Sequence, residues 1–439
     1  MKLPQYVEHC VRRLEDAGFA AYAVGGCVRD ALLGLEPHDY DLCTAASPEE
    51  IQAIFANERL VLAGLKHGTV GIVTPEGVVE TTTFRTEGGY ADSRHPDWVA
   101  FVDTVEKDLA RRDFTVNAMA WSPTRGLADP FGGRSDLEAK VLRAVGDPET
   151  RFREDALRIL RGVRFAVRFG LTVEQSTEEA MFRLAPLMEN LARERVFEEL
   201  CKLLPLVTAE DLVRFVPVLT AVIPELAPMV GFDQHSPHHA YDIYTHTAHV
   251  VENTPPELAL RWAALLHDTG KVPTFTRDET GRGHFYGHAQ ESAAIADAVL
   301  RRLKAPTDLR EQVVNLVKLH MTKIEPEKKT VRRWLGRLGP DGVEALLHFQ
   351  KADMVSKGVS KDSELAQFLR LRDLVSEILA EDACLSLRDL AVDGNDLMAL
   401  GYKGKAIGDC LSRLLDAVLD ERLPNEREAL LEEAEVTLP

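Results

Sequence analysis

The sequence has few cysteines, a deficit of positive charge and no long uninterrupted apolar run. Its 439 residues include 6 cysteines, none of which forms a C-x-x-C pair, so the sequence predicts neither a zinc knuckle nor a disulfide framework. No stretch approaches the roughly 18 uncharged apolar residues of a membrane-spanning helix. The segment from Met1 to Glu8 lacks the apolar core of a signal peptide. We therefore expect a cytoplasmic protein with no membrane partner.

Positive charge is scarce, because 52 Lys and Arg face 70 Asp and Glu, for a formal net charge of −18. Taken alone, this balance argues against a nucleic-acid-binding protein. A chain that binds RNA would have to use local basic patches on an acidic body. Such patches are present at Arg158, Arg161, Arg164 and Arg168, at Arg301, Arg302 and Lys304, and at Lys328, Lys329, Arg332, Arg333 and Arg337. The last two groups are explained equally well as solvated helix faces.

The most informative stretch begins at a pair of glycines. Residues 19–24 are apolar and aromatic, which predicts a buried strand, and Gly25 and Gly26 follow where a helical pattern opens. Glycines at such a junction let the backbone approach a ligand closely, and a helix N-terminus offers N–H groups to an anion. Arg29 adds a positive charge one turn later. We predict a phosphate-binding loop at Gly25, Gly26 and Arg29.

Two aspartates follow with one residue between them. On a strand, Asp39 and Asp41 would point to the same side. Paired carboxylates near a triphosphate suit Mg²⁺, and two such ions can activate a hydroxyl and stabilise a leaving pyrophosphate. A glycine pair alone is usually a turn, and D-x-D alone is usually a solvated strand edge. Together, the run G-G-x-V-R-D-x-L-L-G, five residues and D-x-D-x-x-T resembles the motif of class II tRNA nucleotidyltransferases in the polymerase-β superfamily.

A hairpin and a polar segment come next. The patterns at 70–74 and 78–84 predict two strands joined by a turn at 75–77. Glu80 on the second strand could face the aspartate pair or could equally be an exposed strand carboxylate. Residues 85–97 are polar and unpatterned, which predicts a mobile loop.

The run R-R-D-F-T-x-N-A-M at 111–119 resembles the family's second motif, which holds the ribose and the triphosphate. The resemblance implies that Arg112 donates to phosphate and that Asp113 accepts from sugar hydroxyls.

An amphipathic pattern predicts one helix over residues 150–169. On that helix Asp155 and Arg158 would be neighbours, where an ordinary ion pair is the plain explanation. The stretch E-D-A-L-R-I-L-R also resembles the family's E-D-x-x-R-x-x-R motif. The resemblance implies that these two side chains read the base edge of the incoming nucleotide, accepting cytosine or adenine. It also implies that Arg161 and Arg164 face the triphosphate.

A second group of polar residues lies in the C-terminal half: His246, His267, Asp268, His288, His320 and Asp353. The order H…HD…D, with the core L-L-H-D-x-G-K, resembles the HD-domain metal phosphohydrolases. That resemblance implies a metal site at His246, His267, Asp268 and Asp353, and this ligand set suits Ni²⁺, Mn²⁺, Co²⁺ or Zn²⁺. His288 and His320 could supply a second metal or grip phosphate, or could be ordinary surface histidines.

We therefore predict an α+β chain with a polymerase-β-like nucleotidyltransferase head and an all-α remainder. The head, with a small mixed sheet, would cover residues 1–145, and a helical neck that binds the nucleotide base and RNA would cover 146–230. A metal-dependent HD phosphohydrolase domain would cover 231–380. A helical tail that binds tRNA would cover 381–439.

The resemblance implies template-independent addition of CCA to the tRNA 3′ end from CTP and ATP, and hydrolysis of 2′,3′-cyclic phosphates or phosphomonoesters at the HD site. A poly(A) polymerase would share the head motifs, and an enzyme that adds only A would keep the loop at 85–97. Enzymes that add only CC typically lack that loop, which argues against them. An RNA-end hydrolase or binding module with an inactive head is a different alternative, and the intact Asp39, Asp41 and Asp155 argue against it.

Overall fold

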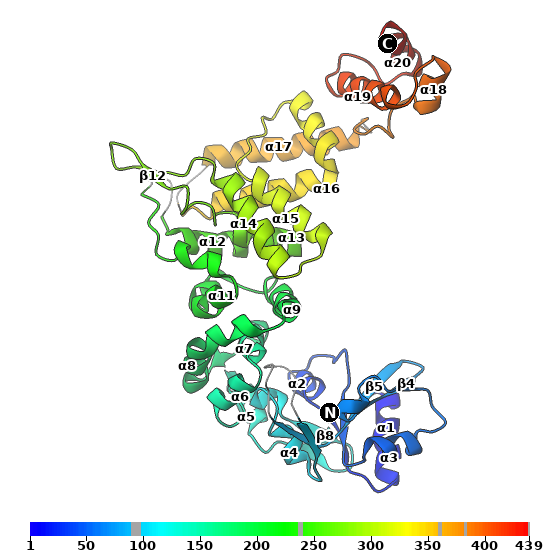
Figure 1. Cartoon of the computed structure of the whole chain (residues 1–439), viewed down its shortest axis with the longest axis vertical. Coiled ribbons are helices and arrows are strands. Elements are labelled where there is room, and N and C mark those ends of the chain that lie inside the picture. The colour runs from blue at the N-terminus through cyan, green and yellow to red at the C-terminus, as the bar shows by residue number, and fades with distance from the viewer. Residues whose placement is uncertain (89–97, 236–239, 359–361, 382–383, 438–439) are drawn as a thin grey trace. The chain divides into compact units, whose positions relative to one another are not determined.

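A computed structural model describes residues 1–88, 98–235, 240–358, 362–381 and 384–437 (Figure 1). The chain forms two compact units, residues 1–207 with 214–224 and residues 208–213 with 225–439. The boundary after residue 224 lies close to the one predicted at 230, while the finer division into four parts stays a prediction. Within the described residues, no helix has both the length and the apolar character needed to cross a membrane.

A seven-stranded mixed sheet forms the core of the first unit, in the order β3-β4-β5-β2-β1-β8-β9. Strands β2 and β5 pair in parallel, and the other neighbours are antiparallel. This sheet, followed by helices, confirms the predicted α+β class. The strands span β1 Ala21–Val24, β2 Leu42–Thr44, β3 Leu60–Val61, β4 Thr69–Thr74, β5 Gly77–Thr83, β8 Ala120–Ser122 and β9 Gly126–Ala128.

The predicted hairpin is confirmed as β4 and β5, which pair from Thr69 opposite Thr82 to Thr74 opposite Gly77. The predicted loop over 85–97 is wrong in its first part. Arg85–Gly88 forms β6, which pairs with β7 (Trp98–Phe101) as a separate two-stranded ribbon. Backbone pairing with a strand ten residues away stabilises this polar segment, and its own pattern does not reveal that partner. The rest of the predicted loop, 89–97, lies outside the described residues.

The predicted single helix over 150–169 is also wrong, because it is two helices, α6 (Pro148–Glu154) and α7 (Leu157–Phe169). Asp155 separates them in an extended conformation, with φ −144° and ψ 103°. Its carboxylate accepts a hydrogen bond from the backbone N–H of Leu157 at 3.0 Å. Aspartate competes with helix hydrogen bonds in this way and favours helix starts over helix interiors.

The first unit contains further helices around this core. They are α1 Gln5–Asp16, α2 Gly26–Leu32, α3 Pro48–Ile54, α4 Val105–Leu109, α5 Gly133–Glu138, α8 Gln175–Leu184, α9 Arg193–Leu203 and α11 Val216–Val222, with 3-10 turns at Leu65–His67, Thr115–Asn117 and Ala185–Asn190. A short parallel pair, β10 (Val141–Leu142) with β11 (Thr172–Val173), lies in the same unit. Helix α7 packs against α9.

The second unit is almost entirely helical, and α12 to α16 pack on one another (Figure 1). Its helices are α12 Ile243–Asn253, α13 Leu258–Leu266, α14 His288–Arg302, α15 Thr307–Leu319, α16 Lys328–Val355, α17 Asp362–Ala380, α18 Gly394–Ala399, α19 Lys405–Leu419 and α20 Arg427–Val436, with a 3-10 turn at Pro224–Met229. Helix α10 (Ala209–Arg214) lies where the chain passes between the units. A hairpin of β12 (Thr276–Arg277) and β13 (Gly283–His284) precedes α14.

Candidate functional site

The glycine loop joins β1 to α2 and carries an arginine against it. Gly25 has a φ of 78°, which residues with a Cβ rarely adopt. A Cβ at this position would lie 2.8 Å from Nη1 of Arg112. The Nε of Arg112 is buried and makes no hydrogen bond. Glycine thus lets a guanidinium approach the loop, which is the arrangement that an anionic ligand such as phosphate needs.

The aspartate pair lies immediately before β2 and not within a strand as predicted, since β2 begins at Leu42. The ladder stops there because β1 ends at Val24, where the chain turns into the glycine loop. The last bond is donated by Val24 N–H to the carbonyl of Asp41 at 2.9 Å. Asp39 and Asp41 therefore lie just before the first residue of the central strand β2, beside the glycine loop.

A third carboxylate joins them. The parallel pairing of Leu42 with Thr81 brings Glu80 next to Asp41. Burial raises the pKa of Asp41 above its ordinary value, the charges of Glu80 and Asp39 raise it further, and Arg112 opposes them. A divalent cation would relieve the repulsion among these neighbouring carboxylates, and carboxylate oxygens are ligands that fit Mg²⁺.

Asp113 lies at the centre of a buried network. One carboxylate oxygen accepts from the backbone N–H of Phe114 at 2.9 Å and from the Asn117 amide at 3.0 Å. The other accepts two bonds from Arg161, at 2.9 and 2.7 Å. Burial alone would raise the pKa of Asp113, but Arg161 and the Asn117 amide outweigh burial and lower it to about 2. Asp113 is therefore ionised at neutral pH and ties the second motif to α7.

Arg29 extends the same network. It donates from Nη1 to the side-chain amide oxygen of Asn117 at 2.5 Å and from Nε and Nη2 to Asp30 at 2.9 and 2.7 Å. Its guanidinium also lies 4.4 Å from the centre of the Phe169 ring. These contacts hold α2 against α7, and direct contact of Arg29 with phosphate stays a prediction.

The E-D-x-x-R stretch does not form the ion pair that a continuous helix would have allowed. Asp155 accepts from Arg195 of α9 at 2.8 Å, whereas Arg158 donates to Glu154 at 2.8 Å and to the carbonyl of Arg111 at 3.0 Å. The two side chains have separate partners because the chain breaks between α6 and α7. Their predicted role in reading the base stays a prediction.

Arg164 is buried and donates to Glu199 of α9 at 2.6 Å. The structure thus gives it a partner within the helical part of the first unit, and its predicted contact with the triphosphate stays a prediction. Of the predicted phosphate-binding arginines, Arg112 and Arg29 lie at the glycine loop, Arg112 against Gly25 and Arg29 near Gly26.

In the second unit, the predicted HD residues gather in one buried group, the histidine–aspartate cluster. It consists of His246, His267, Asp268, His288, His320 and Asp353. Nε2 of His246 lies 3.0 Å from Asp353, and Nε2 of His267 lies 3.1 Å from Asp268. Asp268 also lies 3.6 Å from Nε2 of His288. Asp268 thus stands between two sets of candidate ligands, one with His246 and His267 and one with His288 and His320.

The hydrogen bonds of the four histidines define how they face the cluster. In each ring Nδ1 meets a backbone carbonyl, of Ser356 for His246, Ala264 for His267, Phe285 for His288 and Val317 for His320. A carbonyl only accepts, so Nδ1 carries a proton in each ring. His288 and His320, whose pKa values are lowered, each present an Nε2 lone pair to the cluster. Nε2 of His246 instead lies within hydrogen-bonding distance of Asp353, and Asp268 raises the pKa of His267 against the effect of burial.

The Nε2 atoms face one another and the carboxylates. Nε2 of His288 lies 3.3 Å from Nε2 of His320, and the buried Nε2 of His267 makes no well-aligned hydrogen bond. Burial and, to a smaller extent, His267 together lower the pKa of His320 to about 4, so His320 is neutral at pH 7. Burial also lowers the pKa of His288. Imidazoles whose Nδ1 is held by a carbonyl and whose Nε2 faces carboxylates fit divalent transition metals.

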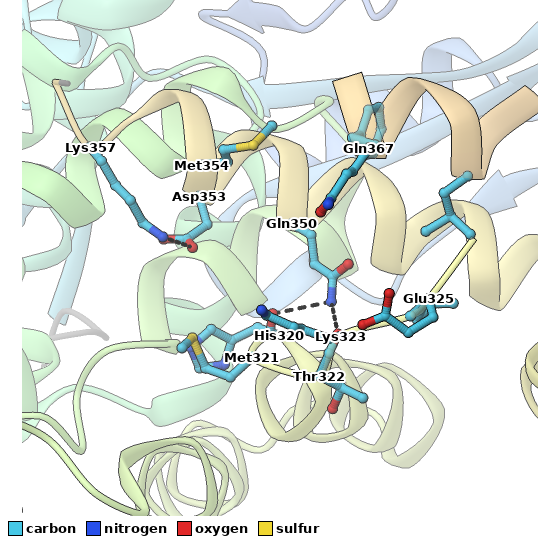
Figure 2. A pocket seen from close by; sticks show the side chains of 13 residues that line it. His320, Met321, Thr322, Lys323, Glu325, Gln350, Asp353, Met354, Lys357 and Gln367 are labelled. Carbon is cyan, nitrogen blue, oxygen red and sulfur yellow. Dashed lines mark hydrogen bonds and ion pairs between the residues drawn. The ribbon is translucent and has the colours of Figure 1, made fainter. Parts of the chain in front are cut away.

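Two of the cavities reach this cluster. One, of about 270 Å³, is lined by Asp268, His288 and His320 among others. The other, of about 210 Å³, shares His320 and Asp353 with the first and continues toward α17. Figure 2 shows its wall, where Gln350 donates to the carbonyls of His320 and Thr322 and Lys357 pairs with Asp353. A small ligand can therefore reach the cluster from outside.

The sequence of the chain matches family models and known relatives. The Poly A polymerase head domain model matches residues 21–143, the model for the probable RNA and SrmB-binding site of polymerase A matches 170–214, and tRNA nucleotidyltransferase domain 2 matches 285–434. The CCA-adding enzyme of Bacillus velezensis is 33% identical over 424 residues, covering 96% of this chain and 95% of the relative. The chain belongs to the CCA-adding enzyme family. The CCA-adding enzyme of Latilactobacillus sakei is 35% identical and covers 98% of each chain.

Solved CCA-adding enzymes share the fold. The Bacillus stearothermophilus enzyme in complex with CTP superimposes with a TM-score of 0.73 at 27% identity, over 100% of this chain and 98% of that one. The Thermotoga maritima enzyme complexed with tRNA superimposes with a TM-score of 0.60 at 22% identity, over 100% of this chain and 97% of that one. The likeness at 22% is one of fold.

Sequence reasoning left two features of this chain open. Glu80 was left undecided, and its alternation along β5 was the available signal. The basic group on α16 was equally compatible with RNA binding and with a helix face. Its members pair with acidic residues, Lys328 with Glu381 at 2.6 Å and Arg333 with Asp420 at 2.7 Å, which favours the helix face.

Proposed function

We propose that this chain adds CCA to the 3′ end of tRNA, using CTP and ATP and releasing pyrophosphate. One observation carries the proposal. Asp39 and Asp41 lie just before β2, with Glu80 on the neighbouring strand, next to a glycine loop that Arg112 approaches. Carboxylates that can hold Mg²⁺ beside a cationic phosphate-binding loop are the minimum for nucleotidyl transfer. Relatives solved with CTP, ATP and tRNA support these substrates.

The residues of the head would divide the reaction as follows. Asp39 and Asp41, with Glu80 beside them, hold the divalent ions, which when bound acidify the tRNA 3′-hydroxyl and neutralise the leaving group. Arg112 donates hydrogen bonds to the triphosphate. The 3′-oxygen bonds to the α-phosphorus, the bond from that phosphorus to the bridging oxygen breaks, pyrophosphate leaves and the hydroxyl proton is released. The tail, residues 381–439, would hold the tRNA.

The products separate this proposal from its alternatives. The protein is incubated with tRNA ending at the discriminator base, at C or at CC, with CTP, ATP or both, and the 3′ ends are sequenced. We expect CCA on all three substrates, with CTP alone giving CC and growth stopping after A. Addition of A only to the CC substrate would indicate an A-adding enzyme, and long A tracts would indicate a poly(A) polymerase.

Base selection is proposed to depend on Arg158. Its guanidinium is held by Glu154 and the Arg111 carbonyl, and an arginine fork beside a carboxylate can match cytosine or adenine. We expect Arg158→Ala to lower the preference for CTP and ATP over UTP and GTP by about 5- to 100-fold, since an unpaired base edge costs about 1–3 kcal/mol. The measurement is incorporation from mixed nucleotides.

The matched control for that variant is Arg153→Ala, which removes an exposed arginine of α6. It should leave selection unchanged. Unaltered selection in Arg158→Ala would mean that Arg158 serves only to join α6 and α7.

A second activity is proposed for the histidine–aspartate cluster, namely hydrolysis of 2′,3′-cyclic phosphates or phosphomonoesters at RNA ends. The four Nε2 atoms that gather around Asp268 and Asp353 favour it. Ni²⁺, Mn²⁺, Co²⁺ or Zn²⁺ bound there would make a water acidic enough to be a nucleophile. The water oxygen bonds to phosphorus, one phosphorus–ribose oxygen bond breaks, and that ribose oxygen takes a proton. Lys271, 2.7 Å from Asp268, lies where it can attract the phosphate.

A further inference from the structure

An exposed aromatic ring stands at the entrance to the histidine–aspartate cluster. The side chain of Tyr286 follows β13 and is 76% exposed. It lines the cavity of about 270 Å³ whose inner wall contains Asp268, His288 and His320. An aromatic residue that buries so little of its ring contributes little to the core, so its position calls for another explanation.

The ring is held in place from one side. His284 stacks on Tyr286 with ring centres 5.3 Å apart and an angle of 6° between the planes. The hydroxyl of Tyr286 lies 3.3 Å from Nδ1 of His284, and Nε2 of His284 lies 2.7 Å from Asp278. Asp278 in turn accepts from the backbone N–H groups of Thr280 and Arg282 in the hairpin turn. The hairpin thus holds the ring, and most of the Tyr286 side chain stays exposed among the described residues.

The cavity next to the ring contains positively charged groups that could bind a phosphate. Lys271 and Lys357 both line it, with Nζ 2.7 Å from Asp268 and 3.0 Å from Asp353 respectively. A volume of about 270 Å³ is just below the roughly 300–1,000 Å³ of typical small-molecule sites. It can enclose one nucleotide unit and not a longer segment.

We propose that Tyr286 is a stacking platform for the nucleobase of a terminal nucleotide whose phosphate lies at the histidine–aspartate cluster. The inference rests on the proposed hydrolase activity and names its substrate class: the phosphorylated terminal nucleotide of an RNA, rather than a phosphoester without a base. Stacking on an aromatic ring tolerates any base, so the platform selects for a base and not for its identity.

The test compares two substrates on the full-length protein loaded with Mn²⁺ or Ni²⁺. One is 2′,3′-cyclic AMP, and the other is the 2′,3′-cyclic phosphate of a ribose that carries no base. We expect Tyr286→Ala to raise KM for the nucleotide by about 5- to 100-fold, the range of a lost base–aromatic contact, with kcat little changed. KM for the base-free substrate should stay the same. Tyr286→Phe, which keeps the ring, should restore the wild-type KM.

The matched control is Glu279→Ala, an exposed residue of the same hairpin turn that lines neither cavity. Equal changes in KM for both substrates, or none, would overturn the platform while leaving the hydrolase standing. If the wild type hydrolyses neither substrate, calorimetric binding of the two ligands decides. Metal-dependent binding of the nucleotide that Tyr286→Ala weakens would support the platform without hydrolysis, and no binding would overturn both.

Discussion

Asp41→Asn is expected to abolish the addition of both C and A, by about 10³-fold or more, without unfolding the protein. Asparagine keeps the shape of aspartate and removes the charge that holds a divalent ion, and several kcal/mol of transition-state stabilisation depend on that ion. Asp41 lies just before β2, and its backbone carbonyl accepts a hydrogen bond from the N–H of Val24. The substitution does not change this backbone bond. Single-turnover incorporation of CTP and ATP measures the effect.

The same substitution makes a prediction on stability. The folded-state pKa of Asp41 is raised by burial and by Glu80 and Asp39. A raised carboxyl pKa favours folding only when the group is protonated, and this contribution is lost as the pH rises through the folded-state pKa. At pH 7 the ionised Asp41 therefore opposes folding of the metal-free protein. Asp41→Asn should unfold at the same temperature as the wild type or higher.

The effect of Mg²⁺ on the unfolding temperature gives a second measurement on the same variant. Mg²⁺ should raise the unfolding temperature of the wild type, because it binds the folded state, and it should fail to do so in Asp41→Asn. Asp103→Asn, at an exposed carboxylate that forms an ion pair with Lys107, serves as the control and should keep both activity and the response to Mg²⁺. Near-wild-type addition by Asp41→Asn would refute the head assignment.

Asp268→Asn is expected to remove phosphodiesterase activity that depends on a transition metal while leaving Mg²⁺-dependent nucleotide addition intact. Asp268 stands between the two candidate ligand sets, so its loss disrupts both. Burial alone would raise the pKa of Asp268, but His267 and Lys271 outweigh burial and hold it well below its ordinary value. The carboxylate is thus ionised and available as a ligand at neutral pH.

The control in the second unit is His249→Ala. It removes a histidine of α12 whose ring lies against Tyr241 and outside the cluster. It should retain hydrolysis. Metal content measured on the purified proteins gives an independent readout, with transition metal retained in His249→Ala and reduced in Asp268→Asn. A wild type that holds no transition metal would leave the cluster without the proposed activity.

Features that depend on a local pattern or on a recognised motif could be predicted from the sequence. The β4–β5 hairpin followed from alternation around a Pro-Glu-Gly turn, and the sheet followed by helices was implied by the motif at 25–44. The motif resemblance named His246 and Asp353 together although they are more than 100 positions apart, and the structure brings them within 3.0 Å, while metal binding there stays a prediction. Such features depend on local patterns or on motifs that carry their own geometry.

The side-chain partners that come from distant parts of the chain could not be predicted from the sequence. The helix break at Asp155 depends on Arg195 of α9 as well as on the local cap, and Arg164 is committed to Glu199. Hydrophobic periodicity continues through residues 150–169 and so conceals the break. The charge of a side chain predicts that it has a partner of opposite charge, but not which helix or strand supplies that partner. The basic group on α16, whose acidic partners include Glu381 and Asp420, is a further example.

The claim that one chain carries two separate metal-dependent activities is tested most directly by crossing the two variants with the two assays. Wild type, Asp41→Asn and Asp268→Asn are assayed for Mg²⁺-dependent CCA addition and for Mn²⁺- or Ni²⁺-dependent hydrolysis of 2′,3′-cyclic AMP, with folding checked by circular dichroism. We predict that Asp41→Asn loses addition alone and that Asp268→Asn loses hydrolysis alone. A folded variant that loses both activities would contradict the account.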